Sequence, residues 1–329
     1  MRVSEEFDPH SGIIVDKAIL AIPAGRCAWA TKPHGGCTMC GFNGPFSAKT
    51  KFTLNGKPWP HWLCALYVKR ELRSVRNVPT VLCVFNGGSF LNPDEVPIRT
   101  QEYVADLAAR HPHVVRLFIE SRCEFVSKDR LLRLRNILGK TALEVGVGLE
   151  SATDAVRNGL LNKGLTIDCY AAAIRAIRES GALALTYIFL KPPALSEQKA
   201  IEDAAESIRV AFEAGSHTVS LSCAMVQAGT PLYEKWRQRE YRAPWLWSVV
   251  ETIRQTAAFG PVRVGTFDDE PQPLEVPHNC GACDARVIKA LECYRQTLDV
   301  AELLHETARC ECACRKSWPA LTRGEMGDV

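Results

Sequence analysis

The sequence predicts an α/β fold, a partial (β/α)6 TIM-like barrel followed by a small cysteine-rich C-terminal region. Short apolar runs alternate six times with amphipathic stretches, about 30–40 residues apart, which is typical of parallel strands joined by helices. Polar and glycine-rich turns follow these runs, at the strand ends where parallel barrels bind ligands. After about Ala243, prolines, tryptophans and cysteines replace the alternation. We therefore expect a core domain over residues 1–240 and an extension over residues 241–329.

Each expected element has a local signal. The strands are the apolar runs Ala18–Ala21, Val81–Phe85, Val114–Ile119, Leu143–Val147, Ala182–Leu190 and Thr218–Cys223. The helices are the amphipathic stretches Pro60–Arg76, Pro97–Arg110, Ser127–Leu138 and Ser196–Ala214, and one that starts at Ala152, breaks near Asn162 and restarts after Thr166. Pro97 suits a first helical turn, and the Ser127 hydroxyl suits a helix N-cap.

The composition indicates a globular protein without a targeting segment. The 329 residues carry a net charge of +3, with basic residues spread among acidic ones, whereas nucleic-acid binders more often show a basic stripe. We find no signal-peptide core and no stretch near the roughly 20 apolar residues of a membrane span. Fourteen cysteines without a secretory signal favour metal chemistry in a reducing compartment. We expect a cytoplasmic protein that does not bind membranes.

Three cysteines directly after the first strand are the strongest chemical signal. Cys27, Cys37 and Cys40 have the spacing C-x9-C-x2-C. A closed structural zinc site wants four ligands, so three thiolates at a strand-to-loop junction favour an iron–sulfur cluster. Three cysteines on a four-iron cluster leave one iron open to another ligand.

The order of the turn motifs resembles the radical S-adenosylmethionine superfamily, and the cysteine spacing is similar to the branch with the Elongator catalytic subunit and the archaeosine-biosynthesis radical enzyme. The motifs that carry the resemblance are Gly36-Cys37-Thr38-Met39-Cys40-Gly41, Gly87-Gly88-Ser89, Glu120-Ser121-Arg122, Gly146-Val147-Gly148-Leu149-Glu150-Ser151 and Asn162-Lys163-Gly164. The likeness covers about residues 17–235 and continues into the tail.

This resemblance implies two cofactors and a set of binding residues. A [4Fe–4S] cluster on the three cysteines would chelate S-adenosylmethionine, and an electron donor such as flavodoxin would reduce it. By the same analogy, the residues that hold S-adenosylmethionine are Gly87, Gly88, Ser89, Glu150, Ser151 and Lys163. Gly87-Gly88-Ser89 would hold the methionyl amine through backbone and hydroxyl oxygens. Glu150 and Ser151 would bind the ribose hydroxyls or the methionine portion, and Lys163 the carboxylate. Relatives often have an acidic residue where this chain has Ser89.

A second cysteine group lies in the tail. Its members are Cys280, Cys283, Cys310, Cys312 and Cys314, a C-x2-C pair followed by C-x-C-x-C. These soft ligands suit a structural zinc ion or a second iron–sulfur cluster. If the second segment is extended, its three alternating thiolates share one face and suit a thiophilic ion such as arsenite.

Three functions remain open from the sequence. The tail makes the chain similar to the radical enzyme of arsinothricin (antibiotic) biosynthesis, which implies transfer of the 3-amino-3-carboxypropyl group of S-adenosylmethionine to an arsenic acceptor. The alternative is a lyase of the archaeosine type, which cleaves a C–N bond of a lysine-bearing deazaguanine in transfer RNA beside a transferase partner. The third hypothesis is a non-catalytic iron–sulfur or zinc binding module.

Overall fold

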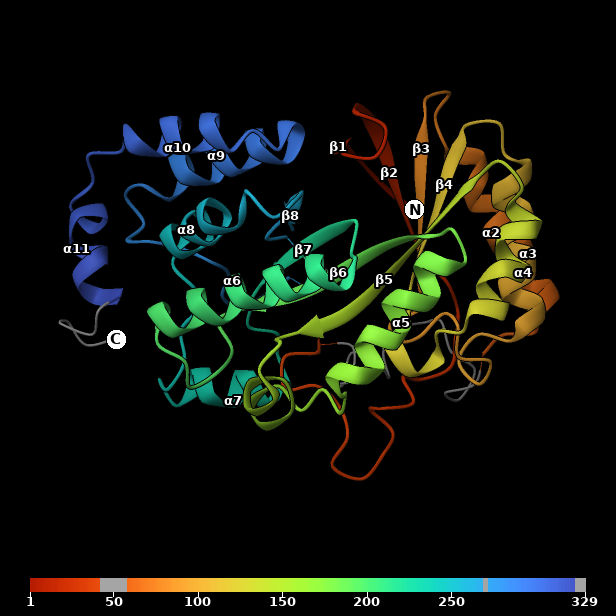
Figure 1. The fold of residues 1–329 in the computed structure, drawn as a ribbon, viewed down its shortest axis with the longest axis horizontal. Coiled ribbons are helices and arrows are strands. Elements are labelled where there is room, and N and C mark those ends of the chain that lie inside the picture. The colour runs from red at the N-terminus through yellow and green to blue at the C-terminus, as the bar shows by residue number, and fades with distance from the viewer. Residues whose placement is uncertain (42–57, 269–271, 323–329) are drawn as a thin grey trace.

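One eight-stranded sheet organises the protein (Figure 1). The computed structural model describes residues 1–41, 58–268 and 272–322, so parts of both expected domains, at 42–57, 269–271 and 323–329, lie outside the described residues. The strands are β1 (Arg2–Asp8), β2 (Ile13–Ala21), β3 (Thr80–Phe85), β4 (Val114–Glu120), β5 (Ala142–Glu150), β6 (Leu183–Leu190), β7 (Thr218–Cys223) and β8 (Val262–Val264). They follow one another across the sheet in sequence order, β2 to β8 parallel and β1 antiparallel to β2.

Helices surround this curved sheet. They are α2 (His61–Glu71), α3 (Ile98–Arg110), α4 (Lys128–Leu138), α5 (Ile167–Glu179), α6 (Glu197–Ala214), α7 (Pro231–Arg237), α8 (Leu246–Thr256), α9 (Asp284–Thr297), α10 (Val300–Ala308) and α11 (Ala313–Thr322). Of these, α3 to α6 pack directly on the strands of the sheet. Short helical turns lie at Leu72–Ser74, Cys123–Phe125 and Ala155–Leu160. Figure 1 shows α2 to α5 along the first strands, with α6 and α8 farther round and α9 to α11 at the other end.

The six strands predicted from the sequence are confirmed as β2 to β7, and with them the partial barrel. β1 and β8 were not predicted from the sequence. β1 reads RVSEEFD and its first four residues are exposed, so it lacks the apolar run by which the other strands were recognised. β8 has three residues, which is too short to show a period.

The two faces of the strands bury different residues. On β3, Leu82 and Val84 belong to the main core beneath the helices. Val81, Cys83 and Phe85 alternate with them and face the interior of the barrel. Because successive strand residues point to opposite faces, the same strands build the core and line a cavity.

The helix boundaries follow local capping. Ser127, Thr166 and Ser196 each accept a hydrogen bond from a backbone N–H in the first turn of the helix that follows. Of the helix predicted to start at Ala152, only the short helical turn Ala155–Leu160 forms before the helix is interrupted. Among the described residues, none of the helices combines the length and apolar character needed to cross a bilayer.

Candidate functional site

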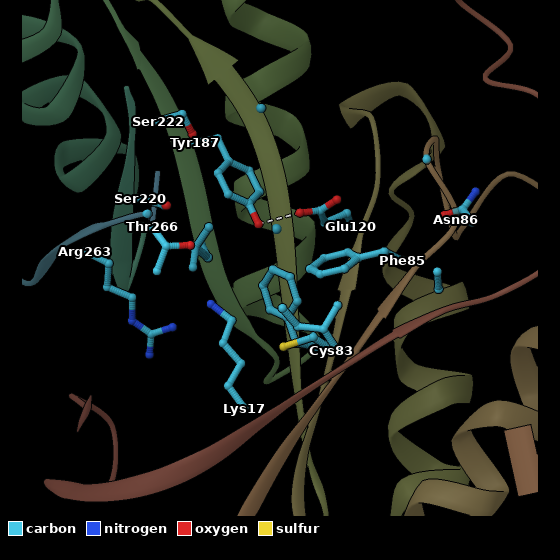
Figure 2. A pocket seen from close by; sticks show the side chains of 18 of the residues that line it. Lys17, Cys83, Phe85, Asn86, Glu120, Tyr187, Ser220, Ser222, Arg263 and Thr266 are labelled. Atoms are coloured by element: carbon cyan, nitrogen blue, oxygen red, sulfur yellow. Dashed lines mark hydrogen bonds between the residues drawn. The ribbon is translucent and has the colours of Figure 1, made fainter. Parts of the chain in front are cut away.

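A cavity of about 780 Å³ opens inside the curve of the sheet. It brings together seven of the residues predicted to bind cofactors: Cys27, Cys37, Cys40, Gly87, Gly88, Glu150 and Lys163. Figure 2 shows other parts of the wall, with side chains reaching inward from β2, β3, β4, β6, β7 and β8. Segments far apart in the sequence therefore meet at one site, as expected for the carboxyl ends of parallel strands.

The cysteine loop is held in place by the segment that breaks the helix after β5. The Asn162 side-chain amide donates to the carbonyls of His34 (2.9 Å) and Gly36 (2.8 Å), and Trp29 Nε1 donates to the Asn162 carbonyl (2.8 Å). Gly164, at φ +60°, lies against the Trp29 ring, where a Cβ atom would clash. The Asn162-Lys163-Gly164 motif thus supports the loop as well as the cavity wall.

Glu95 supports the same loop from the other side, and the sequence analysis missed it. Its buried carboxylate accepts from the backbone N–H groups of Ala28 (3.0 Å) and Ser89 (2.6 Å) and from the Asn92 amide (3.0 Å). Burial raises the pKa of Glu95, while these hydrogen bonds oppose the shift. A Cβ on Gly88 would collide with this carboxylate, so glycine allows the turn and the acid to touch. An acid just before a proline-started helix gives no sequence signal for this role.

Glu150 and Lys163 form an ion pair in the wall of the cavity. Lys163 Nζ lies 2.7 Å from Glu150 Oε1, and both side chains are nearly buried. Burial lowers the pKa of Lys163, but the Glu150 carboxylate and Cys37 outweigh it and hold the pKa above its ordinary value. Burial also raises the pKa of the Cys37 thiol, while Lys163 lowers it. A lysine ammonium therefore stands beside a predicted cluster ligand.

Ser89 and Ser151 do not line the cavity, unlike their neighbours in the same motifs. Both are fully buried. The Ser89 hydroxyl accepts from the Arg122 backbone N–H (3.2 Å), and the Ser151 hydroxyl donates to Asp203 (2.8 Å). Their hydroxyls thus stabilise these turns from the side that faces away from the cavity. The strand and turn geometry that exposes Gly88 and Glu150 turns these serines away.

Two polar side chains, Tyr187 and Glu120, form a hydrogen-bonded pair in the cavity wall. The Tyr187 hydroxyl donates to Glu120 (Figure 2), and both residues line the cavity. Burial raises the pKa of Glu120 and holds that of Tyr187 well above its ordinary value. Arg122, from the same predicted motif, instead pairs with Glu124 and lies over the Trp29 ring at 5.2 Å.

The tail cysteines gather away from this cavity, and none of them is among its lining residues. The Sγ atoms of Cys280, Cys283, Cys312 and Cys314 lie within 4.8 Å of one another. Cys310 is buried but outside this group. The idea of an extended segment with three thiolates on one face is wrong, because α11 begins at Ala313 and turns the chain after Cys312.

The spacing of the thiols in the tail and in the core suits two different metal groups. Zinc–sulfur bonds of 2.3 Å in a tetrahedron put sulfurs about 3.8 Å apart, which matches the close tail group. In the described residues, the tail group is the one place where three or more metal-binding side chains gather so tightly. Cys27, Cys37 and Cys40 share a cavity wall without that close packing. Three soft, more widely spread thiolates suit the larger iron–sulfur cluster.

Solved structures show the same fold. The chain is similar to Elp3 of the archaeon Methanocaldococcus infernus, with a TM-score of 0.55 and 15% identity over 90% of this chain and 64% of that one. Methylornithine synthase matches with a TM-score of 0.50 and 15% identity over 75% of this chain and 63% of the other. At such identities the likeness establishes the fold alone.

Curated relatives establish the family. Archaeosine synthase subunit beta of Thermococcus kodakarensis is 33% identical over 298 residues, 89% of this chain and 87% of that protein. The subunit of the same name from Methanosarcina acetivorans is 29% identical over 93% of this chain and 85% of its own length. No protein-family model matches the sequence. The chain therefore belongs to the archaeosine synthase subunit beta family.

Proposed function

We propose that this protein cleaves S-adenosylmethionine reductively in the barrel cavity and that its reaction is of the archaeosine type. The observation that carries the proposal is the shared cavity. Cys27, Cys37 and Cys40 line it together with the Gly87-Gly88 turn and the Glu150–Lys163 pair. A relationship to archaeosine synthase subunit beta over about nine-tenths of the chain supports the reaction type.

In this proposal the three cysteines hold a [4Fe–4S] cluster with one open iron. The cluster, when bound, supplies the electron that breaks a carbon–sulfur bond of S-adenosylmethionine. The Gly87-Gly88 backbone approaches the methionyl amine closely because neither residue has a side chain. The Lys163 ammonium, on the same wall, binds the methionyl carboxylate. Glu150 accepts from the ribose hydroxyls and keeps Lys163 oriented. The walls exclude water from the reacting carbon.

The substrate in this proposal is a lysine-bearing deazaguanine in transfer RNA. The cavity volume of about 780 Å³ is in the range of pockets that hold cofactors and drug-sized ligands, about 300–1,000 Å³. A base that reacts inside such a cavity must leave its stack and enter the pocket. The relatives are named as one subunit of a synthase, so we also propose a partner subunit that presents the RNA or prepares its base.

One assay tests the reaction. The protein is reconstituted with iron and sulfide, reduced, and incubated with S-adenosylmethionine, with and without lysine-modified transfer RNA. Mass spectrometry should find 5′-deoxyadenosine, formed faster with the modified RNA, and a changed base in that RNA. Formation of neither 5′-deoxyadenosine nor methylthioadenosine at catalytic turnover would leave only the non-catalytic binding module.

A second candidate is transfer of the 3-amino-3-carboxypropyl group to an arsenic acceptor. The soft tail cysteines favour it, because Cys280 is exposed and its hydrogen bonds with neighbouring groups lower its pKa to about 7. Against it, the tail cysteines do not line the cavity where the radical would form. The same assay separates the two candidates, since this one requires methylthioadenosine and an arsenic–carbon product that appear only with arsenite.

We propose zinc as the ligand of the tail cysteines. Cys280 lies 3.4 Å from Cys312, and Cys283 lies 3.4 Å from Cys314. The Asn279 amide donates to Cys283, and Trp247 Nε1 donates to Cys314. Such N–H donors stabilise thiolates and orient metal ligands. Four sulfurs at tetrahedral spacing form a closed structural site, and zinc there would join the start of α9 to the start of α11.

A further inference from the structure

One arginine in the cavity wall, Arg295, forms no ion pair with any residue that the structure describes. Arg295 reaches the cavity from the last turn of α9. It donates from Nη2 to the Gly265 carbonyl (3.0 Å), and its guanidinium lies 5.4 Å from the centre of the Phe267 ring. Its Nε is buried without a hydrogen-bond partner. No carboxylate of a described residue forms an ion pair with it within 4.0 Å.

The other cations deep in this part of the cavity are neutralised. Lys17 Nζ lies 2.8 Å from Glu6, and Arg263 lies 3.4 Å from both Glu6 and Asp8. Figure 2 shows Lys17 and Arg263 reaching into the cavity from β2 and β8. Arg295 differs from these neighbours, because it forms no ion pair with a described residue. Burial lowers its pKa, and the carboxylates of Glu292, Asp268 and Glu6 oppose this shift only from a longer distance. A bound anion within hydrogen-bond reach would offset the desolvation of this half-buried guanidinium.

Strands β7 and β8 supply further polar groups to the same cavity that remain available to a ligand. Arg263 Nε is buried without a partner, as Arg295 Nε is. Ser220 and Ser222 line the cavity from β7, and within the described part of the chain their hydroxyls form no hydrogen bond (Figure 2). These groups lie across the sheet from the Gly87-Gly88 turn, because β7 and β8 end the strand order and β3 lies near its start. The S-adenosylmethionine end and the Arg295 end are thus separate parts of one cavity.

We propose that Arg295, assisted by Arg263 and the β7 hydroxyls, binds an anionic group of the acceptor substrate, a carboxylate or a phosphate. A guanidinium offers paired N–H donors that match both groups. The inference rests on the proposed function, because it places the acceptor opposite the predicted S-adenosylmethionine residues. For the archaeosine-type substrate, the carboxylate of the lysine substituent is the group that this subsite holds.

Direct binding tests the subsite without any turnover. Calorimetric titration of the reconstituted protein with acetate, and separately with inorganic phosphate, should show binding that weakens at least tenfold in Arg295→Gln and recovers partly in Arg295→Lys. Lys289→Gln, an exposed change on the same helix, should bind as the wild type does. Equal binding of both anions by wild type and Arg295→Gln, in protein with an unchanged melting temperature, would overturn the proposal.

Kinetics then identify the anion. With lysine-modified transfer RNA, Arg295→Gln should raise KM by about 10–100-fold, more than it lowers kcat, because a charged hydrogen-bonded contact to bound substrate is lost. Amidation of the lysine carboxylate should remove most of this difference if the carboxylate is the ligand. An undiminished difference, with competition by inorganic phosphate in the wild type alone, assigns the site to phosphate. An unchanged KM with either substrate contradicts the proposal. Failure of all S-adenosylmethionine cleavage would overturn the proposed function and leave the calorimetric result standing.

Discussion

The two cysteine groups of this protein differ in how their sulfurs are surrounded. In the tail, four thiols lie within 4.8 Å of one another and receive hydrogen bonds from Asn279 and Trp247. In the core, Cys27, Cys37 and Cys40 are spread along the wall of a cavity. Four crowded sulfurs complete a tetrahedron by themselves, whereas three spread sulfurs leave room for a ligand. The number and spacing of the sulfurs thus separate the site that we propose to be closed and structural from the one that we propose to be open and reactive.

The supports of the two groups also differ. The tail thiols stand at the beginnings of α9 and α11, so helices near them in sequence position them. The core loop has no regular structure over Cys27–Cys40 and depends on Glu95 and Asn162, which are distant in sequence. The core site should therefore be sensitive to mutations of Glu95 and Asn162, far from its cysteines. In the tail, Trp247 is the distant residue that contacts the thiols.

The largest expected effect comes from Cys37→Ser. Loss of one of three cluster ligands should reduce S-adenosylmethionine cleavage by at least about 1,000-fold. Bound iron should fall while one tail zinc per chain remains, as elemental analysis would show. Cys293→Ser, on α9 and outside both groups, is the matched control and should keep iron, zinc and activity. Full turnover in Cys37→Ser would remove the distinction between the two groups.

Cys312→Ser tests the closed site. Loss of one of four ligands should release zinc and lower the melting temperature by about 5–10 °C, because a structural metal contributes folding free energy. The iron–sulfur absorbance of the core should persist. Cys310→Ser, also in the tail but outside the group, should retain zinc. If Cys310→Ser lost zinc as readily, the four-cysteine assignment would be wrong.

Glu95→Gln tests the distant support of the core loop. The amide has one acceptor oxygen for two backbone N–H donors, from Ala28 and Ser89, and turns an NH₂ group toward them. Loss of a charged hydrogen bond costs about 1.5–3 kcal/mol, so kcat/KM for S-adenosylmethionine cleavage should fall about 10–100-fold. Zinc should stay. Glu202→Gln, on the surface of α6, serves as control, and equal behaviour of the two variants would show that Glu95 does not matter.

Asn162→Ala should have the smallest effect of the four. It removes two hydrogen bonds to the cysteine loop and puts alanine at φ +49°, where asparagine and glycine are better tolerated. We expect about 3–10-fold slower cleavage and weaker iron retention. Asn162→Gly relieves the backbone strain but not the lost bonds, so comparing the two separates the causes. Activity restored in full by glycine would show that the side-chain bonds contribute nothing.

Much of the fold could be predicted because the sequence signals for its strands and helix starts are local. The runs that became β2 to β7 are apolar, and Ser127 and Thr166 mark helix starts. β1 was not predicted, because its pairing with β2, rather than its own composition, makes it a strand. The motif residues Gly88 and Ser89 are adjacent, yet only Gly88 lines the cavity, since the direction of a side chain depends on the folded turn.

Residue type and spacing were enough to predict the chemistry that this protein has available: three cysteines after the first apolar strand, soft ligands in the tail, and turns at the ends of parallel strands. These are local properties, so they can be recognised without a structure. Which of these groups meet depends on the folded chain. It joined Cys280 and Cys283 to Cys312 and Cys314, and left Cys310 outside. It also placed Arg295, from the C-terminal region, in the wall of the barrel cavity. Such contacts depend on how helices pack across the sheet, and no run of neighbouring residues encodes that alone.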